Sequence, residues 1–342
     1  MRLSENCFMV WQKNHQLQGG NYTIERELGR GRYCITDLAK DNNNNHVVIK
    51  TLNDDELNLQ IQTNQLTQTE RDGLEAKFLL EAEKLQPLQK HPHIVKVIDY
   101  FKEGQQGCIV MEYIPGDTLN RLVKRVLPEP EALRYIRQIG EALIEVHKLG
   151  WVHRDVKPEN IMIRASKYEA VLIDFDLVRG FNYPLSRHVI AKGFTPLELY
   201  GDKREKGAYT DVYALAATLY AVLTGEVPPD AQDLKDGKMQ LIPPKELNPA
   251  ISERVNRAIL EGMQLEGKNR PQTMQEWLDL LGLKKQISLP FPQSDAMTVW
   301  QAIGTLATVL AAIVALVAYL KPPASPSPNA TPVEIPTPSR NQ

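Results

Sequence analysis

The stretch WVHRDVKPENIM, from Trp151 to Met162, places a His, an Arg, an Asp, a Lys and an Asn close together. Asp155 in this stretch can accept the proton of an attacking hydroxyl group. Lys157, two residues later, can reach a phosphate in transfer, and Asn160 can bind a divalent cation through its amide oxygen. Phosphoryl transfer depends mainly on positioning and on compensation of charge. The stretch therefore indicates phosphoryl-transfer chemistry.

Other groups suited to the same reaction occur on both sides of this stretch. Asp174 follows the apolar run AVLI, so it lies where a buried strand ends and where a second metal ligand can be placed. Gly29 and Gly31 leave the backbone bare for a close approach of phosphates, although this signal is weak when it stands alone. Lys50 ends the strand-like run VVIK and is a cation for phosphates, and Glu81 is the carboxylate best placed to hold it.

The elements that must position these residues change in type along the chain. From Tyr22 to Lys50 the alternating and apolar runs predict short strands, as do HIVKVIDYF and GCIVMEYI further on. Residues 54–75 are polar and predict a loop or an exposed helix, whereas EAKFLLEAEKLQPL has helical spacing. From Pro128 onward the pattern is mostly helical. A strand-rich first part and a helix-rich second part predict an α+β protein with two lobes.

Taken together and in this order, the motifs resemble the protein-kinase superfamily of the Ser/Thr type, in a bacterial membrane-anchored form. The resemblance covers about Tyr22 to Leu281, and HRDVKPEN is its most specific element. It implies a small β-rich N-lobe and a larger helical C-lobe. It also implies an ATP-dependent protein serine/threonine kinase that phosphorylates a protein hydroxyl, with autophosphorylation, in bacterial signalling. The implied cofactors are ATP and Mg²⁺, and Mn²⁺ is an alternative to Mg²⁺ at the same site.

The resemblance gives each candidate residue a role. Asp155 is the implied catalytic base, Lys157 the implied clamp on the γ-phosphate, and Asn160 and Asp174 the implied metal ligands. His153 is implied to pack, with Phe175, rather than to react. The implied ATP-binding residues are Leu28, Gly29, Gly31, Val48, Lys50, Glu81, Met111, Glu112, Ile114 and Met162. Outside the nucleotide site, the resemblance implies that Asp211 anchors the catalytic loop and that Glu198 pairs with Arg270.

Four positions depart from the family pattern. Cys34 stands in place of the third glycine of the loop, and Thr36 in place of an apolar residue over the adenine. Asp176 replaces the glycine of the metal-binding triplet, and Ala191 replaces a threonine that helps to shape the acceptor site, unless Thr195 takes that part. These departures leave a pseudokinase open, a nucleotide-binding or scaffolding module with little transfer activity. A kinase of small molecules is a further alternative.

The termini differ from the kinase-like body. We expect an N-terminal extension over residues 1–21, the kinase domain over 22–281 and a linker over 282–297. Residues 298–320 are uncharged and apolar, and a helix of this length rises roughly 35 Å, enough to cross a bilayer core of about 30 Å. The Pro/Ser/Thr-rich tail over residues 321–342 is expected to be disordered.

The cellular context follows from this layout. The sequence predicts a single-pass protein of a bacterial cell membrane, with the kinase domain in the cytoplasm, where ATP is. The expected partners are a protein substrate with Ser or Thr, ATP, and the membrane. Small residues in the span, Gly304, Ala307 and Ala311, allow a homodimer, although lipid-facing positions are the preferred interpretation of them. The net charge of −2 and the lack of a basic tract argue against nucleic acid as a partner.

Overall fold

The structure is a computed structural model. It describes residues 11–31, 34–63, 67–104, 106–123, 126–165, 168–175, 179–180, 190–201 and 205–283. The chain divides into two units, Met1–Lys284 and Lys285–Gln342, and only the first contains described residues. The predicted linker beyond 283, the predicted span over 298–320 and the predicted tail therefore lie outside the described residues. Within the described ranges, no helix is both long enough and apolar enough to cross a membrane.

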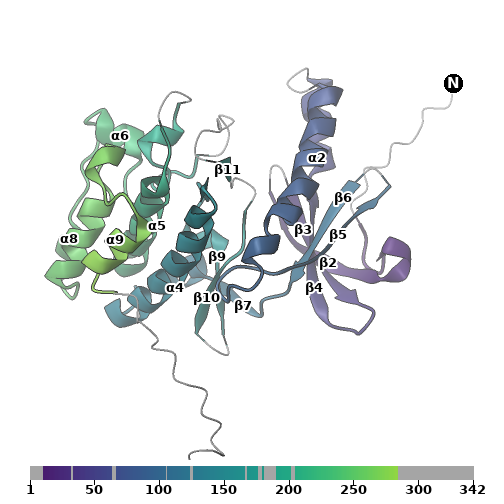
Figure 1. Ribbon diagram of the computed structural model, residues 1–342, viewed down its shortest axis with the longest axis horizontal. Coiled ribbons are helices and arrows are strands. Elements are labelled where there is room, and N and C mark those ends of the chain that lie inside the picture. The colour runs from purple at the N-terminus through teal and green to yellow at the C-terminus, as the bar shows by residue number, and fades with distance from the viewer. Residues whose placement is uncertain are drawn as a thin grey trace, which may run out of the picture. The chain divides into compact units, whose positions relative to one another are not determined.

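The first part of the chain forms one antiparallel sheet, whose strands follow the order β1-β2-β3-β4-β6-β5 (Figure 1). The asparagine-rich turn between the third and fourth strands is held by Asp41, whose carboxylate accepts the backbone N–H groups of Asn43 and Asn45. The bounds are β1 Gln16–Leu17, β2 Tyr22–Arg30, β3 Cys34–Asp41, β4 His46–Leu52, β5 Val97–Glu103 and β6 Gln106–Glu112.

The described part of the N-terminal extension, residues 11–21, belongs to this sheet. Leu17 in β1 is fully buried and Trp11 nearly so, and both cover one face of the sheet. The short helix η1 (Gln18–Gly20) then reaches the strand at the opposite edge, where the Gln18 backbone N–H donates to Glu103 Oε2 at 2.8 Å. Other members of this apolar cluster are Tyr22, Ile24, Ala39, Val47, Ile49, Cys108 and Val110.

Two helices connect β4 to β5. The polar segment after β4 contains α1 (Asp54–Gln62), which settles the choice between a loop and a helix. α2 (Gln68–Lys84) packs on β6 and β5, with Phe78 and Ala82 buried as its spacing predicted. A short turn, η2 (Gln86–Leu88), follows it.

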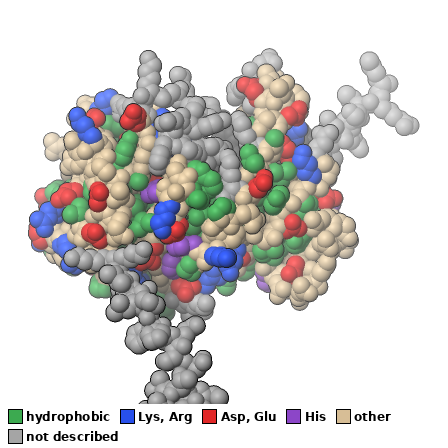
Figure 2. All heavy atoms as spheres, in the orientation of Figure 1, with side chains coloured by type: hydrophobic (Ala, Val, Ile, Leu, Met, Phe, Trp, Pro, Cys, Tyr) green, Lys and Arg blue, Asp and Glu red, His purple; other side chains and the backbone are tan. Residues whose placement is uncertain are grey.

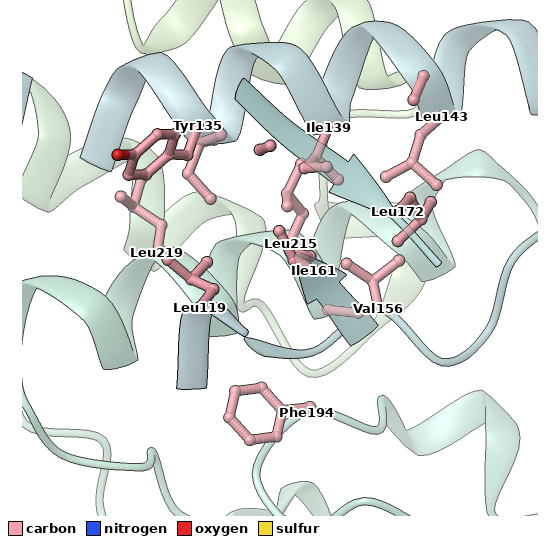
Figure 3. Close-up of a cluster of buried hydrophobic side chains, with 14 of the residues drawn as sticks. Leu119, Tyr135, Ile139, Leu143, Val156, Ile161, Leu172, Phe194, Leu215 and Leu219 are labelled. Atoms are coloured by element: carbon pink, nitrogen blue, oxygen red, sulfur yellow. The ribbon is translucent and has the colours of Figure 1, made fainter. Parts of the chain in front are cut away.

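The second part of the chain is helical. α5 is apolar along almost its whole length and is buried among α4, α8 and α9. Figure 3 shows part of this core: Leu143 of α4 lies beside Leu172, and Ile139 beside Leu215 of α5. The bounds are α3 Leu119–Val123, α4 Glu129–Lys148, α5 Ala208–Thr224, α6 Ala231–Lys235, α7 Pro244–Leu247, α8 Glu253–Gly262 and α9 Met274–Leu280.

Short strands lie at the junction of the two parts and carry the predicted catalytic segments. β9 and β10 form an antiparallel hairpin, in which Ile161 is paired with Leu172. Asn160 precedes this pair and Asp174 follows it, so the hairpin brings both predicted metal ligands to one end. The bounds are β7 Gly116–Thr118, β8 Trp151–Val152, β9 Ile161–Arg164, β10 Glu169–Leu172, β11 Arg179–Gly180, η3 Pro158–Asn160, η4 Leu197–Leu199 and η5 Gly267–Asn269.

Gly116 explains how β7 joins this hairpin. A Cβ atom at this position would overlap the backbone carbonyl oxygen of Ile163, because β7 pairs closely with β9. Only glycine fits such an approach of two backbones.

The two-lobed α+β fold predicted from the sequence is confirmed for the described residues. On the face that Figure 2 shows, their Lys and Arg side chains are interspersed with Asp and Glu.

Candidate active site

A cavity of about 1030 Å³ lies between the sheet and the β9–β10 hairpin. Its walls come from the ends of β2 and β3 beside the glycine-rich turn, from β4, from the segment after β6, and from the catalytic loop. The predicted site residues that line it are Leu28, Gly29, Gly31, Val48, Lys50, Met111, Glu112, Ile114, Asp155, Lys157, Asn160, Met162 and Asp174. The side chain of Glu81, the remaining predicted residue, lies outside the described atoms.

Asp155 is the centre of the catalytic loop. Its carboxylate accepts hydrogen bonds from Lys157 Nζ at 2.7 and 2.8 Å and from Asn160 Nδ2 at 2.8 Å. Burial raises the pKa of Asp155, the charge of Lys157 opposes this shift, and the nearby Asp174 adds to it. A carboxylate whose pKa is raised is a better proton acceptor. The loop therefore holds one base in contact with one cation.

The amide of Asn160 is fixed by the same loop. Its nitrogen also donates to the backbone oxygen of Asp155 at 2.8 Å. Because the nitrogen is committed to Asp155, the amide oxygen is the atom that remains for a cation. The geometry agrees with the role expected from the spacing.

Asp174 contacts the predicted lysine of β4. Lys50 Nζ lies 3.0 Å from Asp174 Oδ1, and the lysine side chain is only 10% exposed. Sequence reasoning had named Glu81 as the partner of Lys50 and did not anticipate this contact. The two residues are 124 positions apart, so spacing along the chain gave no signal for it.

The donors present fit a hard divalent cation. Asp174 and Asn160 offer oxygen atoms, which Mg²⁺ prefers, and Mg²⁺ is usually held by one or two protein side chains together with substrate phosphates. Across the part of the chain that the structure describes, no group of three or more His, Cys, Asp or Glu side chains could hold a metal by itself. The site thus suits a metal that enters together with a phosphate ligand.

Asp211 of α5 anchors the catalytic loop through hydrogen bonds to its backbone. It is fully buried in α5, and its carboxylate accepts the backbone N–H groups of His153 and Arg154, each at 2.8 Å. Arg154 has a φ of 72°, a left-handed conformation that a non-glycine residue rarely adopts. The two hydrogen bonds stabilise this conformation, as the resemblance implied for Asp211. His147 Nε2 also lies 2.8 Å from Asp211, a contact that sequence reasoning missed.

The electrostatics of this anchor favour a charged carboxylate. Burial alone would raise the pKa of Asp211, but the hydrogen bond and charge of His147, the nearby His153 and the Arg154 N–H together hold the pKa below its usual range. His153 is fully buried against the ring of Phe175, with the ring centres 4.9 Å apart. Burial lowers the pKa of His153. This histidine packs, as expected, and is not exposed to a substrate.

Two of the departures from the family pattern are visible in the cavity. The Thr36 hydroxyl donates to the backbone oxygen of Gly29 at 3.1 Å, so its polar group is satisfied within the sheet. Cys34 is half-buried and its backbone oxygen accepts the Gly31 N–H at 2.8 Å. Neither residue closes the cavity that both of them line. Asp176 lies outside the described residues.

The fourth departure lies in the segment that leads to α5. The Ala191 N–H donates to the hydroxyl of Thr195 at 2.9 Å, so this hydroxyl accepts a hydrogen bond from its own segment.

Further along the chain, Glu198 forms a buried ion pair with Arg270, with an N–O distance of 2.7 Å. This pair is the one that the resemblance implied.

The end of β6 is joined to the other lobe by an ion pair. Arg164 in β9 contacts Glu112 at 3.1 Å, and both side chains are 19% exposed. The backbone N–H of Glu112 donates to the Lys96 oxygen at 2.9 Å. Arg164 was not predicted, because a single arginine in a strand has no distinctive spacing.

Comparison with known proteins identifies the family. The model of the protein kinase domain matches residues 22–279. A probable serine/threonine-protein kinase of Clostridium acetobutylicum is 32% identical over 273 residues, which cover 76% of this chain and 39% of that protein. A second one, from Clostridium perfringens, is 28% identical over 294 residues, which cover 82% of this chain and 41% of that protein. The chain thus spans about two fifths of the length of these relatives.

Solved structures agree on the fold. A chain described as PpkA-294 in its apo form has a TM-score of 0.64 and 23% identity, and the match covers 79% of this chain and 99% of that one. The kinase domain of PknI from Mycobacterium tuberculosis has a TM-score of 0.59 and 22% identity, with 80% and 98% covered. The match of the family model over residues 22–279 shows that the chain belongs to the protein kinase family.

Proposed function

We propose that this protein is an ATP-dependent serine/threonine protein kinase that phosphorylates proteins, itself included, in bacterial signalling. The observation that carries the proposal is the meeting of Lys50, Asp155, Lys157, Asn160 and Asp174 at one cavity. These residues come from both lobes, and the fold brings them together at this cavity. The names of the clostridial relatives support Ser or Thr as the acceptor.

The chemistry follows from the contacts. The acceptor oxygen attacks the γ-phosphorus of ATP, the bond to the β,γ-bridging oxygen breaks, and ADP leaves. Asp155 receives the proton of the acceptor hydroxyl, which its raised pKa favours. Lys157, held 2.7 Å from Asp155, lies where it can neutralise the charge of the transferred group. Lys50 compensates the phosphates from β4, which forms another wall of the cavity.

Asn160 and Asp174 would hold Mg²⁺, or Mn²⁺ in its place. The metal would neutralise charge on the β and γ phosphates. The residues of the chain do the rest: they orient the acceptor, fix the phosphates and accept the proton.

We also propose that residues 298–320 anchor the protein in a bacterial cell membrane as a single span, with the kinase domain in the cytoplasm. The support is the uncharged, apolar sequence of that segment. Small residues along the span allow a homodimer. Expression in bacteria followed by carbonate extraction tests the anchor: the full chain should stay in the membrane pellet, and a chain that ends at residue 290 should not.

The kinase activity is tested by transfer of label from γ-labelled ATP. The full chain in mild detergent is incubated with Mg²⁺ or Mn²⁺ and a general Ser/Thr substrate, beside Asp155→Asn. Label that appears with the wild type and is lost in the variant supports the proposal. If the wild type binds ATP in a thermal-shift assay but transfers no label, the protein is a pseudokinase, a nucleotide-binding or scaffolding module.

A further inference from the structure

The first turn of α1 contacts the glycine-rich segment beside the phosphate end of the cavity. Asn53, the residue that caps α1, donates from Nδ2 to the backbone oxygen of Gly31 at 2.8 Å. The Gly31 N–H in turn donates to the Cys34 oxygen at 2.8 Å. Both backbone groups of Gly31 are therefore held, one by the sheet and one by α1.

Asn53 is itself fixed in place. It is 6% exposed, and its Oδ1 accepts the backbone N–H of Glu56 at 3.4 Å, which caps the helix. The residue before it, Leu52, ends β4, and its backbone oxygen accepts a hydrogen bond from the buried side chain of Gln106 at 3.1 Å. The asparagine thus presents its amide nitrogen to Gly31 from a rigid position.

A second contact joins the same turn to the same segment. Arg30, between the two glycines, contacts Glu27 at 2.7 Å and Asp55 of α1 at 3.0 Å. These side chains are between 31% and 41% exposed, and ion pairs so exposed contribute little. The hydrogen bond from the buried side chain of Asn53 is the contact expected to dominate.

α1 is also fastened to the helix that follows. Arg71 of α2 contacts Asp54 at 2.8 Å, and the arginine side chain is 14% exposed. The turn that holds Gly31 is therefore not a loose connection between β4 and α2. It has a defined position relative to the wall of the cavity.

We propose that Asn53 is a positioning residue for the nucleotide phosphates, acting through the backbone of Gly31. The inference rests on the proposed binding of ATP in this cavity. The family pattern has a third glycine where this chain has Cys34, and the added side chain restricts the segment. Fixing Gly31 from α1 keeps its backbone in place for the phosphates without relying on that glycine.

The test separates the two functions of the asparagine. Asn53→Asp and Asn53→Ser keep an oxygen that caps α1, since Asp, Ser and Asn are comparable caps. Asp removes the donor to Gly31 but adds a charge, and Ser replaces the amide with a shorter, uncharged hydroxyl. Asn58→Asp, one turn and a half further along α1, is the matched control for charge. The full chain is used throughout, and Kd is measured by calorimetry for MgATP and for adenosine, which lacks phosphates.

Both Asn53 variants should raise the Kd for MgATP by about 2- to 10-fold, the loss expected for one hydrogen bond. The Kd for adenosine should stay as in the wild type. The Tm should fall only slightly, because the bond to Gly31 is also present without nucleotide, and Asn58→Asp should leave both Kd values unchanged. An unchanged Kd for MgATP, or an equal loss of adenosine binding, overturns the inference. A wild type that binds no MgATP overturns the proposed function and this inference together. A wild type that binds MgATP without transferring phosphate overturns only the proposed activity, because the Kd comparison still decides the role of Asn53.

Discussion

Replacing Asp211 by asparagine should destabilise the protein and slow catalysis together. The carboxylate is fully buried and accepts hydrogen bonds from two backbone N–H groups, while His147 Nε2 lies 2.8 Å away. An asparagine has the same shape, but its NH₂ group faces donors and leaves at least one of them unpaired. Leaving a buried N–H donor unsatisfied costs about 1–3 kcal/mol, and more when the lost partner is a charged group. At about 2–4 °C per kcal/mol for a domain of this size, the Tm should fall by roughly 2–12 °C or more.

The catalytic effect has a separate cause. Asp211 holds the backbone of Arg154 in a left-handed conformation, next to Asp155. When the two hydrogen bonds weaken, the loop relaxes and the base moves, and a displacement of about 1 Å can cost about 100-fold in rate. The assays are thermal unfolding and phosphate transfer measured well below the lower Tm. Asp279→Asn, an exposed change of the same type on α9, is the control and should leave both values within error.

A Tm within about 1 °C of the wild type would refute this reasoning, because a buried carboxylate with these donors cannot be neutralised at so little cost. A large fall in Tm without any loss of rate at low temperature would refute only the link to the loop. The pH dependence gives a further check. The lowered pKa of Asp211 means that its stabilisation is present above the unfolded pKa of about 3.9 and is lost as the pH falls through the folded value.

Three other changes test separate parts of the structure. Lys157→Met removes the cation that opposes the raised pKa of Asp155, so the acid limb of the pH profile of kcat/KM should move to higher pH while kcat falls. An acid limb that does not move would mean that the titration of Asp155 does not set it. Leu17→Ala should lower the Tm by about 4–20 °C, from about 2–5 kcal/mol for a fully buried leucine; an unchanged Tm in calorimetry would mean that residues 11–21 are not packed on the sheet. Burial and the charge of Glu27 raise the pKa of Asp37 to about 6, against the pull of Arg30, so the folded state loses stability as pH rises towards and through that value; Asp37→Asn should therefore raise the Tm more at pH 8 than at pH 4.

The sequence was sufficient to predict the site residues that one loop or one hairpin holds together. Asp155, Lys157 and Asn160 lie within six positions, so their chemistry could be judged before the fold was known. The change from strand-like to helical patterns likewise predicted two lobes, because apolar periodicity depends on local geometry. Asp174 was found because it follows a buried strand.

Contacts between distant residues could not be predicted in the same way. Asn53 precedes a polar segment that was predicted only as a loop or an exposed helix, and nothing in its neighbours indicates Gly31, 22 positions away. His147 and Asp211 are 64 positions apart, and Arg164 and Glu112 are 52 apart. Single polar residues at such separations have no period and no motif, so only the packed fold shows which of them meet.

The packing of the N-terminal extension on the sheet was not predicted, for a related reason. Its apolar residues show no strand or helix periodicity, and the family match begins only at residue 22. Leu17 and Trp11 are nevertheless buried on the sheet, because the outer faces of β3, β4 and β6 would otherwise expose apolar side chains.

This arrangement has a consequence for synthesis on the ribosome. Gln18 is bonded to Glu103, which is made 85 residues later. At roughly 5–20 residues per second, the first strand waits about 4–17 s before the edge that it must reach has been translated. During this interval Trp11 and Leu17 are exposed on a nascent chain that has no complete sheet to cover them. Assembly of the smaller lobe is therefore governed by the arrival of β5 and β6, and the residues of this lobe that emerge first are among the last to find their place.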